Sequence, residues 1–317
     1  MSFNKKIVNL VNEEFENKRI KNESLRDARL IEVYSKIPEL RAIDKELAGT
    51  GAKIMALALG GKDVLSAKLD ELKSRNLELQ SNRALLLSSK GYSDNYTDLH
   101  YDCALCQDYG VSSGKLCSCY KNRLIEEQFK LSGISNLVKK QSFETFSLDV
   151  YENKEEMGEL LDFAKNYVSD FASIKENILF AGGTGLGKTH LSTAIAKSLI
   201  EKGYNVIYET AQNIFFDFDN DRFRDRFSDS EPESQRYLDC DLLIIDDLGS
   251  EAINSFTVSC LYNIINTRLN KNLPIIASTN LNSKEIRDKY HDRITSRLFG
   301  EFTIKIFQGN DLRKIKK

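Results

Sequence analysis

The sequence predicts an α/β domain built on a parallel sheet, preceded by a helical N-terminal region and a metal-type cysteine cluster. Three observations predict this architecture. Short apolar runs alternate with helical segments from Asn177 onward, and residues 1–90 show helical spacing of apolar residues without long β-type alternation. Four cysteines fall between positions 103 and 119. A chain of 317 residues has room for about two domains at roughly 150 residues each.

The composition is that of a folded globular protein. Hydrophobic residues make up 41% of the chain and charged residues 29%, which argues against a disordered or fibrous protein. The formal net charge is −2, so overall charge does not indicate a nucleic-acid-binding protein, although a basic strip can still exist locally. The longest apolar stretch is too short to cross a bilayer, and residues 1–19 lack the features of a secretion signal. We expect a cytoplasmic protein with no membrane partner.

Residues 1–90 are expected to form helices. Apolar residues from Ile7 to Phe15 follow one helix face, and leucines recur every seven residues from Leu65 to Leu86. Polar residues at the companion positions argue against a long coiled coil. The expectation is therefore a small helical bundle that buries these leucines, and a surface for a partner helix is the alternative.

The cysteine cluster predicts a metal site. Cys103-x-x-Cys106 is followed after ten residues by Cys117-x-Cys119, and four thiolates on two short hooks can surround a tetrahedral Zn²⁺. Structural zinc is the expectation. The alternatives are an iron–sulfur cluster, unliganded thiols, and replacement of one cysteine by His100.

After the cysteines, the helical pattern lapses and an α/β pattern begins. We expect a zinc module at 91–130, a linker at 131–150 and the α/β domain at 151–317. Four of the five apolar runs are unbroken, as is typical of parallel strands buried on both faces. The five runs are Asn177–Ala181, Asn205–Tyr208, Leu242–Asp246, Pro274–Ser278 and Phe302–Phe307.

A phosphate-binding motif, G-x-x-x-x-G-K-[ST], is the strongest signal in the chain. It lies between an expected strand and an expected helix, which is the context this motif requires. Backbone N–H groups and the helix N-terminus would face the phosphates, Lys188 would reach the β- and γ-phosphates, and the Thr189 hydroxyl would bind Mg²⁺. The expected ATP-binding residues are Gly182, Gly183, Thr184, Gly185, Leu186, Gly187, Lys188, Thr189 and His190, the last as a packing group.

The apolar run Leu242–Asp246 ends in two carboxylates, which fits the Walker B arrangement. Asp246 would bind Mg²⁺ and Asp247 would polarise the attacking water. An aspartate reaches one methylene less far than a glutamate, so slow ATP hydrolysis is expected. Further along, Asn280 ends a strand, where it would position that water, and Arg293 and Arg297 lie four residues apart on one helix face.

The segments GGTGLGKTHL, LLIIDDLG, STN and RITSRL, in this order, resemble the DnaC/DnaI family of bacterial replicative helicase loaders. They are similar also to the related IstB-type transposition ATPases. The resemblance covers Phe143–Lys317 and implies an AAA+ P-loop NTPase core with a five-stranded parallel sheet. It also implies that Asn280 is sensor 1 and Arg313 is sensor 2. Arg297 would be the arginine finger, with Arg293 in reserve. Typical AAA+ proteins carry a helical lid after the core, but four residues follow Arg313, so no C-terminal lid is expected.

The resemblance also implies partners. An arginine finger acts on a neighbour's γ-phosphate, which implies self-association through ATP sites between subunits. Residues 1–90 would bind a DnaB-type replicative helicase hexamer. In the segment Ala211–Phe227, aromatic residues are followed by arginines, a pattern suited to single-stranded DNA. Phe216, Arg222 and Arg224 are the expected DNA contacts, although nearby aspartates offset the charge and the phenylalanines can equally be core residues.

Together these features predict an ATP-dependent loader of the replicative helicase onto single-stranded DNA, active in DNA replication. One alternative is an IstB-like ATPase that assists DNA transposition. The other is a zinc adaptor in which ATP serves only as a binding switch.

Overall fold

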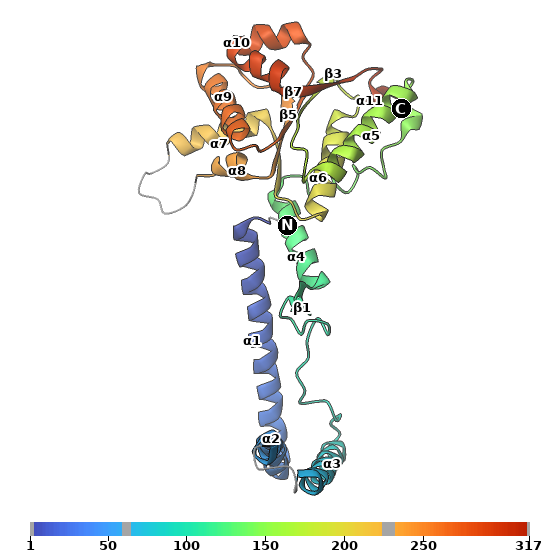
Figure 1. Ribbon diagram of the computed structural model, residues 1–317, viewed down its shortest axis with the longest axis vertical. Coiled ribbons are helices and arrows are strands. Elements are labelled where there is room, and N and C mark those ends of the chain that lie inside the picture. Colours follow the sequence, from blue (N-terminus) through green and yellow to red (C-terminus); the bar gives the residue numbers. More distant parts are fainter. Residues whose placement is uncertain (1–2, 59–64, 224–231, 316–317) are drawn as a thin grey trace. The chain divides into compact units, whose positions relative to one another are not determined.

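The computed structural model describes residues 3–58, 65–223 and 232–315 (Figure 1). The chain divides into two compact units: one is Asn12–Tyr120, and the other combines Met1–Val11 with Lys121–Lys317. None of the helices in the described ranges combines the length and the apolar character that crossing a membrane demands.

The first unit is mainly helical, as the sequence predicts. Its helices are α1 (Lys5–Lys36), whose first residues belong to the other unit, α2 (Pro38–Ala58) and α3 (Leu65–Ser89). Where α1 meets α2, a small apolar core forms from Val33, Ile37, Leu40 and Leu87. Beside it, the Glu32 carboxylate accepts hydrogen bonds from Lys36 and from two tyrosine hydroxyls.

A short hairpin follows the three helices. Strand β1 (Val111–Ser112) pairs antiparallel with β2 (Lys115–Leu116), and α4 (Ser118–Leu131) begins directly after it. Because two hairpin strands and the start of α4 are so close in sequence, the two cysteine hooks are brought to the same place. This local turn, rather than distant packing, forms the cysteine cluster.

The second unit contains a five-stranded sheet, which confirms the predicted fold. All its pairs are parallel, and the strand order is β4-β5-β6-β3-β7. Each strand coincides with one of the apolar runs seen in the sequence. The strands are β3 (Asn177–Gly182), β4 (Val206–Thr210), β5 (Leu242–Leu248), β6 (Ile275–Thr279) and β7 (Phe302–Phe307).

Helices cover both faces of the sheet (Figure 1). Alternation along the strands divides the core, because Ile178 and Phe180 pack in one apolar cluster and Leu179 packs in the other. The first cluster includes α5 (Lys154–Asp170) and α6 (Lys188–Glu201). The second includes residues of α7 (Ala211–Arg222), α8 (Gln235–Asp239), α9 (Ser255–Asn270) and α10 (Ser283–Glu301). After β7, the described chain adds only the short helix α11 (Leu312–Ile315).

The segment 131–150, which the sequence predicts to be a linker, packs against the core of the second unit. Ile134 is fully buried and Phe146 nearly so, and both belong to the core cluster that includes α5 and α6. The 3₁₀ turn η2 (Leu148–Val150) then leads into α5. The absence of helical periodicity here reflects irregular structure packed on the sheet, because apolar side chains spaced through it are buried there.

Candidate nucleotide and metal sites

The phosphate-binding loop joins β3 to α6, as the motif requires. Gly185 and Gly187 have φ angles of +73° and +95°, a backbone region that side chains rarely adopt. A Cβ at Gly187 would stand 2.3 Å from the Tyr151 hydroxyl oxygen. Backbone conformation therefore favours glycine at both positions, and close packing against Tyr151 adds to this requirement at Gly187.

The Lys188 side chain lies at the carboxyl end of the neighbouring strand β6. Its ammonium donates hydrogen bonds of 2.6 Å each to the carbonyls of Gly182 and Gly183 and to Asn280 Oδ1. The side chain is buried, and burial lowers the pKa of Lys188, while the charges of Asp247 and Asp246 oppose that shift. Asn280 thus lies beside the lysine of the phosphate-binding motif.

The Asp246 carboxylate is held by three hydroxyl groups. Thr189 Oγ1 donates to Asp246 Oδ2 at 3.2 Å, the Tyr208 hydroxyl donates to the same oxygen at 2.5 Å, and Ser278 Oγ donates to Oδ1. Thr189 and Asp246 are the expected magnesium ligands, and the structure brings them together. Carboxylate and hydroxyl oxygens are the ligands that Mg²⁺ prefers, so these residues fit the ion.

Tyr208 and Ser278 are not marked by any sequence motif. Both stand near the carboxyl ends of expected strands, and such ends share one edge of a parallel sheet. That placement is the signal that could have found them. Their side chains read as ordinary strand residues, and only the strand order, with β5 between β4 and β6, brings both to Asp246.

Asp247 lies near the end of β5 and has an unusual backbone conformation. Its φ angle is +53°, and its backbone N–H donates to Ser278 Oγ at 3.1 Å. Burial raises the pKa of the Asp247 carboxyl, the Asp246 charge raises it further, and Lys188 and Arg313 act in the opposite direction. The left-handed turn separates the two carboxylates, so Asp246 lies among hydroxyl groups while Asp247 lines the nucleotide pocket.

The nucleotide pocket has a volume of about 450 Å³. One wall is the phosphate-binding loop with Asp247, Asn280 and Arg313. The opposite wall comes from the segment 140–151, in which the Phe146 and Tyr151 rings stack at 5.6 Å between centroids. No sequence motif marks this second wall, because its residues reach the pocket through tertiary packing alone.

Three further contacts connect this wall to the loop. The Tyr151 hydroxyl donates to the Leu186 carbonyl at 3.2 Å. His190 Nε2 lies 3.0 Å from the Ser142 carbonyl oxygen and 3.2 Å from Thr145 Oγ1. The imidazole of His190 therefore joins the two walls of the pocket, which suits a packing role.

The arginines expected in the site are not all in the pocket. Arg313 lines it. Arg297 lies exposed on α10, where its Nη1 is 3.4 Å from Glu301 Oε1, and the pocket lining does not include it. Arg293 is also exposed on the same helix. Within one chain, α10 therefore leaves Arg297 available to a neighbouring molecule and does not bring it to the chain's own phosphate-binding loop.

The four clustered cysteines converge. Their sulfur atoms all lie within 4.8 Å of one another, with Cys103 Sγ 3.8 Å from Cys117 Sγ and Cys106 Sγ 3.5 Å from Cys119 Sγ. A tetrahedral zinc with Zn–S bonds of about 2.3 Å separates its sulfurs by about 3.8 Å. The donor set fits zinc. His100 is exposed and is not part of this group.

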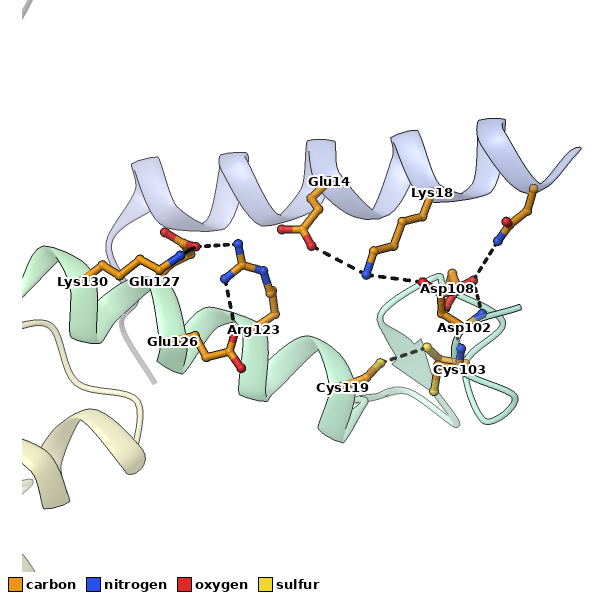
Figure 2. Close-up of polar contacts among 12 residues, drawn as sticks. Glu14, Lys18, Asp102, Cys103, Asp108, Cys119, Arg123, Glu126, Glu127 and Lys130 are labelled. Carbon is orange, nitrogen blue, oxygen red and sulfur yellow. Dashed lines mark hydrogen bonds and ion pairs between the residues drawn. The ribbon is translucent and has the colours of Figure 1, made fainter. Parts of the chain in front are cut away.

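Asp108 organises the first cysteine hook (Figure 2). Its buried carboxylate accepts the backbone N–H groups of Asp102 and Cys103, each at 2.9 Å, and Asn22 Nδ2 donates to it at 3.4 Å. The backbone N–H groups of Cys106 and Leu105 lower the pKa of the Cys103 thiol to about 7. Hydrogen bonds to the Asp108 carboxylate and to the Cys103 thiol therefore shape the hook through protein groups alone.

Two of the expected DNA contacts, Phe216 and Arg222, lie on α7. Phe216 is 65% exposed, and the Arg222 guanidinium lies 4.6 Å from the centroid of the Phe256 ring. Phe215 is buried in the core, as the alternative interpretation of the segment requires. A cleft of about 580 Å³ adjoins Phe216 and Phe256. Arg224 lies outside the described residues.

Comparison with known proteins gives one family and several relatives. Residues 122–299 match the family described as IstB-like ATP binding protein. The phage-like element PBSX protein XkdC of Bacillus subtilis is 28% identical over 222 residues, which is 64% of this chain and 80% of that protein. The replicative helicase loader DnaC of Escherichia coli K12 is 28% identical over 180 residues, or 56% of this chain and 71% of that protein. The crystal structure of DnaI covers 59% of this chain and 100% of its own, at 20% identity and a TM-score of 0.47.

Proposed function

The chain belongs to the family of IstB-like ATP-binding proteins, and from this premise we propose that it is an ATP-hydrolysing loader of a DnaB-type replicative helicase. One observation carries the catalytic half of the proposal: Lys188, Asp247 and Asn280 line one pocket together with the phosphate-binding loop. The helicase half is supported by the relative named as a replicative helicase loader.

Different residues of the pocket bind the phosphates, hold Mg²⁺ and orient the attacking water. The loop N–H groups bind the phosphates, and Lys188 exchanges its carbonyl and Asn280 partners for phosphate oxygens. Thr189 and Asp246 would hold Mg²⁺, which when bound neutralises charge on the β- and γ-phosphates. Asp247 and Asn280 orient the attacking water from two adjacent strands. The side chain of Asp247 reaches one methylene less far than a glutamate, so slow hydrolysis is expected.

Arg297 completes this site from a neighbouring subunit. Its guanidinium makes a weak contact with Glu301, 3.4 Å away on the same helix, so the guanidinium can be redirected at little cost. A guanidinium on the γ-phosphate raises phosphoryl-transfer rates by about 10³–10⁵. Self-association is therefore part of the proposed activity, with Arg313 acting within its own chain.

The N-terminal region binds the partner helicase. Residues 1–90 bind the helicase, and Cys103, Cys106, Cys117 and Cys119 hold a structural Zn²⁺ that fixes the module at 91–130. Since all four donors are thiols, no ligand position is kept for a catalytic water. On α7, Phe216 and Arg222 contact single-stranded DNA by stacking and charge. Arg224, outside the described residues, is the third proposed contact.

The deciding experiment is co-purification with the host replicative helicase, with and without ATP. The full chain should retain the helicase hexamer, and a point variant that removes two zinc ligands, Cys103→Ser with Cys106→Ser, should lose it. Failure to form a complex in either nucleotide state would refute the loader proposal.

A transposition ATPase is the second candidate, since the matched family is IstB-like and a relative is an insertion-sequence ATP-binding protein. That candidate predicts ATP-dependent assembly on duplex DNA and no affinity for the helicase. A third possibility is an adaptor that binds ATP without turnover. Comparing hydrolysis by the wild type with that of Asp247→Asn separates it, because an adaptor gives equal rates.

A further inference from the structure

Tyr208 occupies a position that connects the Mg²⁺ ligand to the start of the ATPase unit. It is the third residue of β4, is 5% exposed, and neighbours β5 through the register pair Tyr208 and Ile244. Its hydroxyl and its backbone have different partners. Both sets of partners lie within the unit that contains Lys121–Lys317.

The side chain of Tyr208 fixes Asp246. The hydroxyl donates to Asp246 Oδ2 at 2.5 Å, and burial together with the Asp246 charge raises the pKa of Tyr208, which keeps it a donor. Ser278 holds the other carboxylate oxygen. Oδ2 also accepts from Thr189, the other expected Mg²⁺ ligand, and that bond is the one that binding of the ion would replace. The hydroxyls of Tyr208 and Ser278 thus orient the carboxylate on its two oxygens.

The backbone of Tyr208 is held by the segment that follows α4. Its N–H donates to the Ser132 carbonyl at 2.9 Å, and a Cβ at Gly133 would stand 2.6 Å from the Tyr208 carbonyl oxygen. Gly133 has a φ angle of +81°. Ser132 and Ile134 are fully buried, so this contact is a packed one.

A second bond attaches the same segment to the sheet edge. Gln128, fully buried near the end of α4, donates through Nε2 to Asn205 Oδ1 at 2.9 Å, just before β4 begins. The segment 128–134 therefore lies along β4 and contacts it at two points. The end of α4 and the residues after it are therefore attached to this edge of the sheet.

We infer that Tyr208 is a positioning residue for the Mg²⁺ site, and that it makes the position of Asp246 depend on the segment 128–134. The inference rests on the proposed ATP-binding function. Its consequence is that a displacement of the segment 128–134 changes Mg²⁺ affinity at the nucleotide site through β4, with no contact to the nucleotide itself.

The test measures the binding of a fluorescent ATP analogue as a function of free Mg²⁺. Tyr208→Phe removes only the hydroxyl. Binding in EDTA should be unchanged, and the Mg²⁺ midpoint should rise about tenfold, as is usual when a group that holds a metal ligand is removed. The control is Tyr167→Phe, which removes a hydroxyl bonded to the Glu176 carbonyl in the same unit.

Gly133→Ala tests the connection to the segment. It should raise the Mg²⁺ midpoint in the wild type and add nothing in the Tyr208→Phe background, because both act through one hydrogen bond. Gly91→Ala is the matched control, since Gly91 has a φ angle of +80° and open space around it.

Each outcome decides a separate claim. An unchanged midpoint in Tyr208→Phe, or an equal rise in Tyr167→Phe, overturns the positioning role. Additive effects of the Tyr208 and Gly133 variants overturn the dependence on the segment. A wild-type chain that binds no nucleotide at any Mg²⁺ concentration refutes the proposed ATPase instead.

Discussion

Replacing Asp108 by alanine should weaken zinc binding without touching a zinc ligand. The carboxylate accepts two backbone N–H groups and the amide of Asn22, and it is 1% exposed (Figure 2). The two N–H donors are only partly buried, so each costs about 1 kcal/mol when left without a partner, and the loss in unfolding free energy is about 2–3 kcal/mol. Zinc affinity should fall by about 10- to 100-fold, as for other groups that orient metal ligands.

The assay is competition with a chromophoric zinc chelator, followed by thermal melting of the zinc-loaded protein. Asp98→Ala is the matched control, because Asp98 is an exposed aspartate just before the first cysteine hook. A folded Asp108→Ala protein with wild-type zinc affinity would refute the reasoning, as would an equal loss in the control. A wild-type chain that takes up no zinc would refute the metal site itself.

Three other predictions follow from the structure. Arg297→Ala should reduce ATP hydrolysis about 10³-fold or more in the assembled protein. It should change the unfolding free energy by less than about 1 kcal/mol, because the ion pair of Arg297 with Glu301 is exposed. A large drop in melting temperature would contradict this. Hydrogen bonds from Lys36 and, to a lesser extent, from two tyrosine hydroxyls lower the pKa of Glu32 to about 2. The ionised Glu32 therefore stabilises the fold fully above about pH 4.5, and this stabilisation disappears as the pH falls toward 2. Melting temperatures across that range should fall less steeply for Glu32→Gln than for the wild type. Gly187→Ala should abolish nucleotide binding measured by fluorescence, because the φ angle of +95° and a tyrosine hydroxyl both oppose a Cβ; wild-type affinity would show that the loop can rearrange.

The sheet and the phosphate-binding loop could be predicted because their physical requirements are local. A parallel strand covered on both faces must be apolar throughout, and runs such as Leu242–Asp246 meet that requirement in sequence alone. The loop needs glycines at fixed spacing for the same local reason. The helical N-terminal region followed equally from periodicity.

What the sequence did not reveal depends on packing between distant segments. Tyr208 and Ser278 act on Asp246 only because β5 lies between β4 and β6. The wall formed by 140–151 carries no motif, and its irregular chain resembles a linker until its apolar residues are seen in the core. His291 interrupts α10 with a φ angle of +58°, although no glycine or proline marks the break.

The strand order also constrains how the protein can be made. β3 leads into the phosphate-binding loop, yet both of its neighbours come later: Ile178 pairs with Ile276 and Asn177 with Phe302. Contacts separated by roughly 100 residues form late and slow the folding of a domain. During synthesis, the loop therefore emerges long before the strands that support it, and Arg313 emerges last of the pocket residues. A nascent chain would thus bind nucleotide only after the sheet is complete. In a chain whose synthesis stops before β6, the phosphate-binding loop lacks the neighbouring strands that support it.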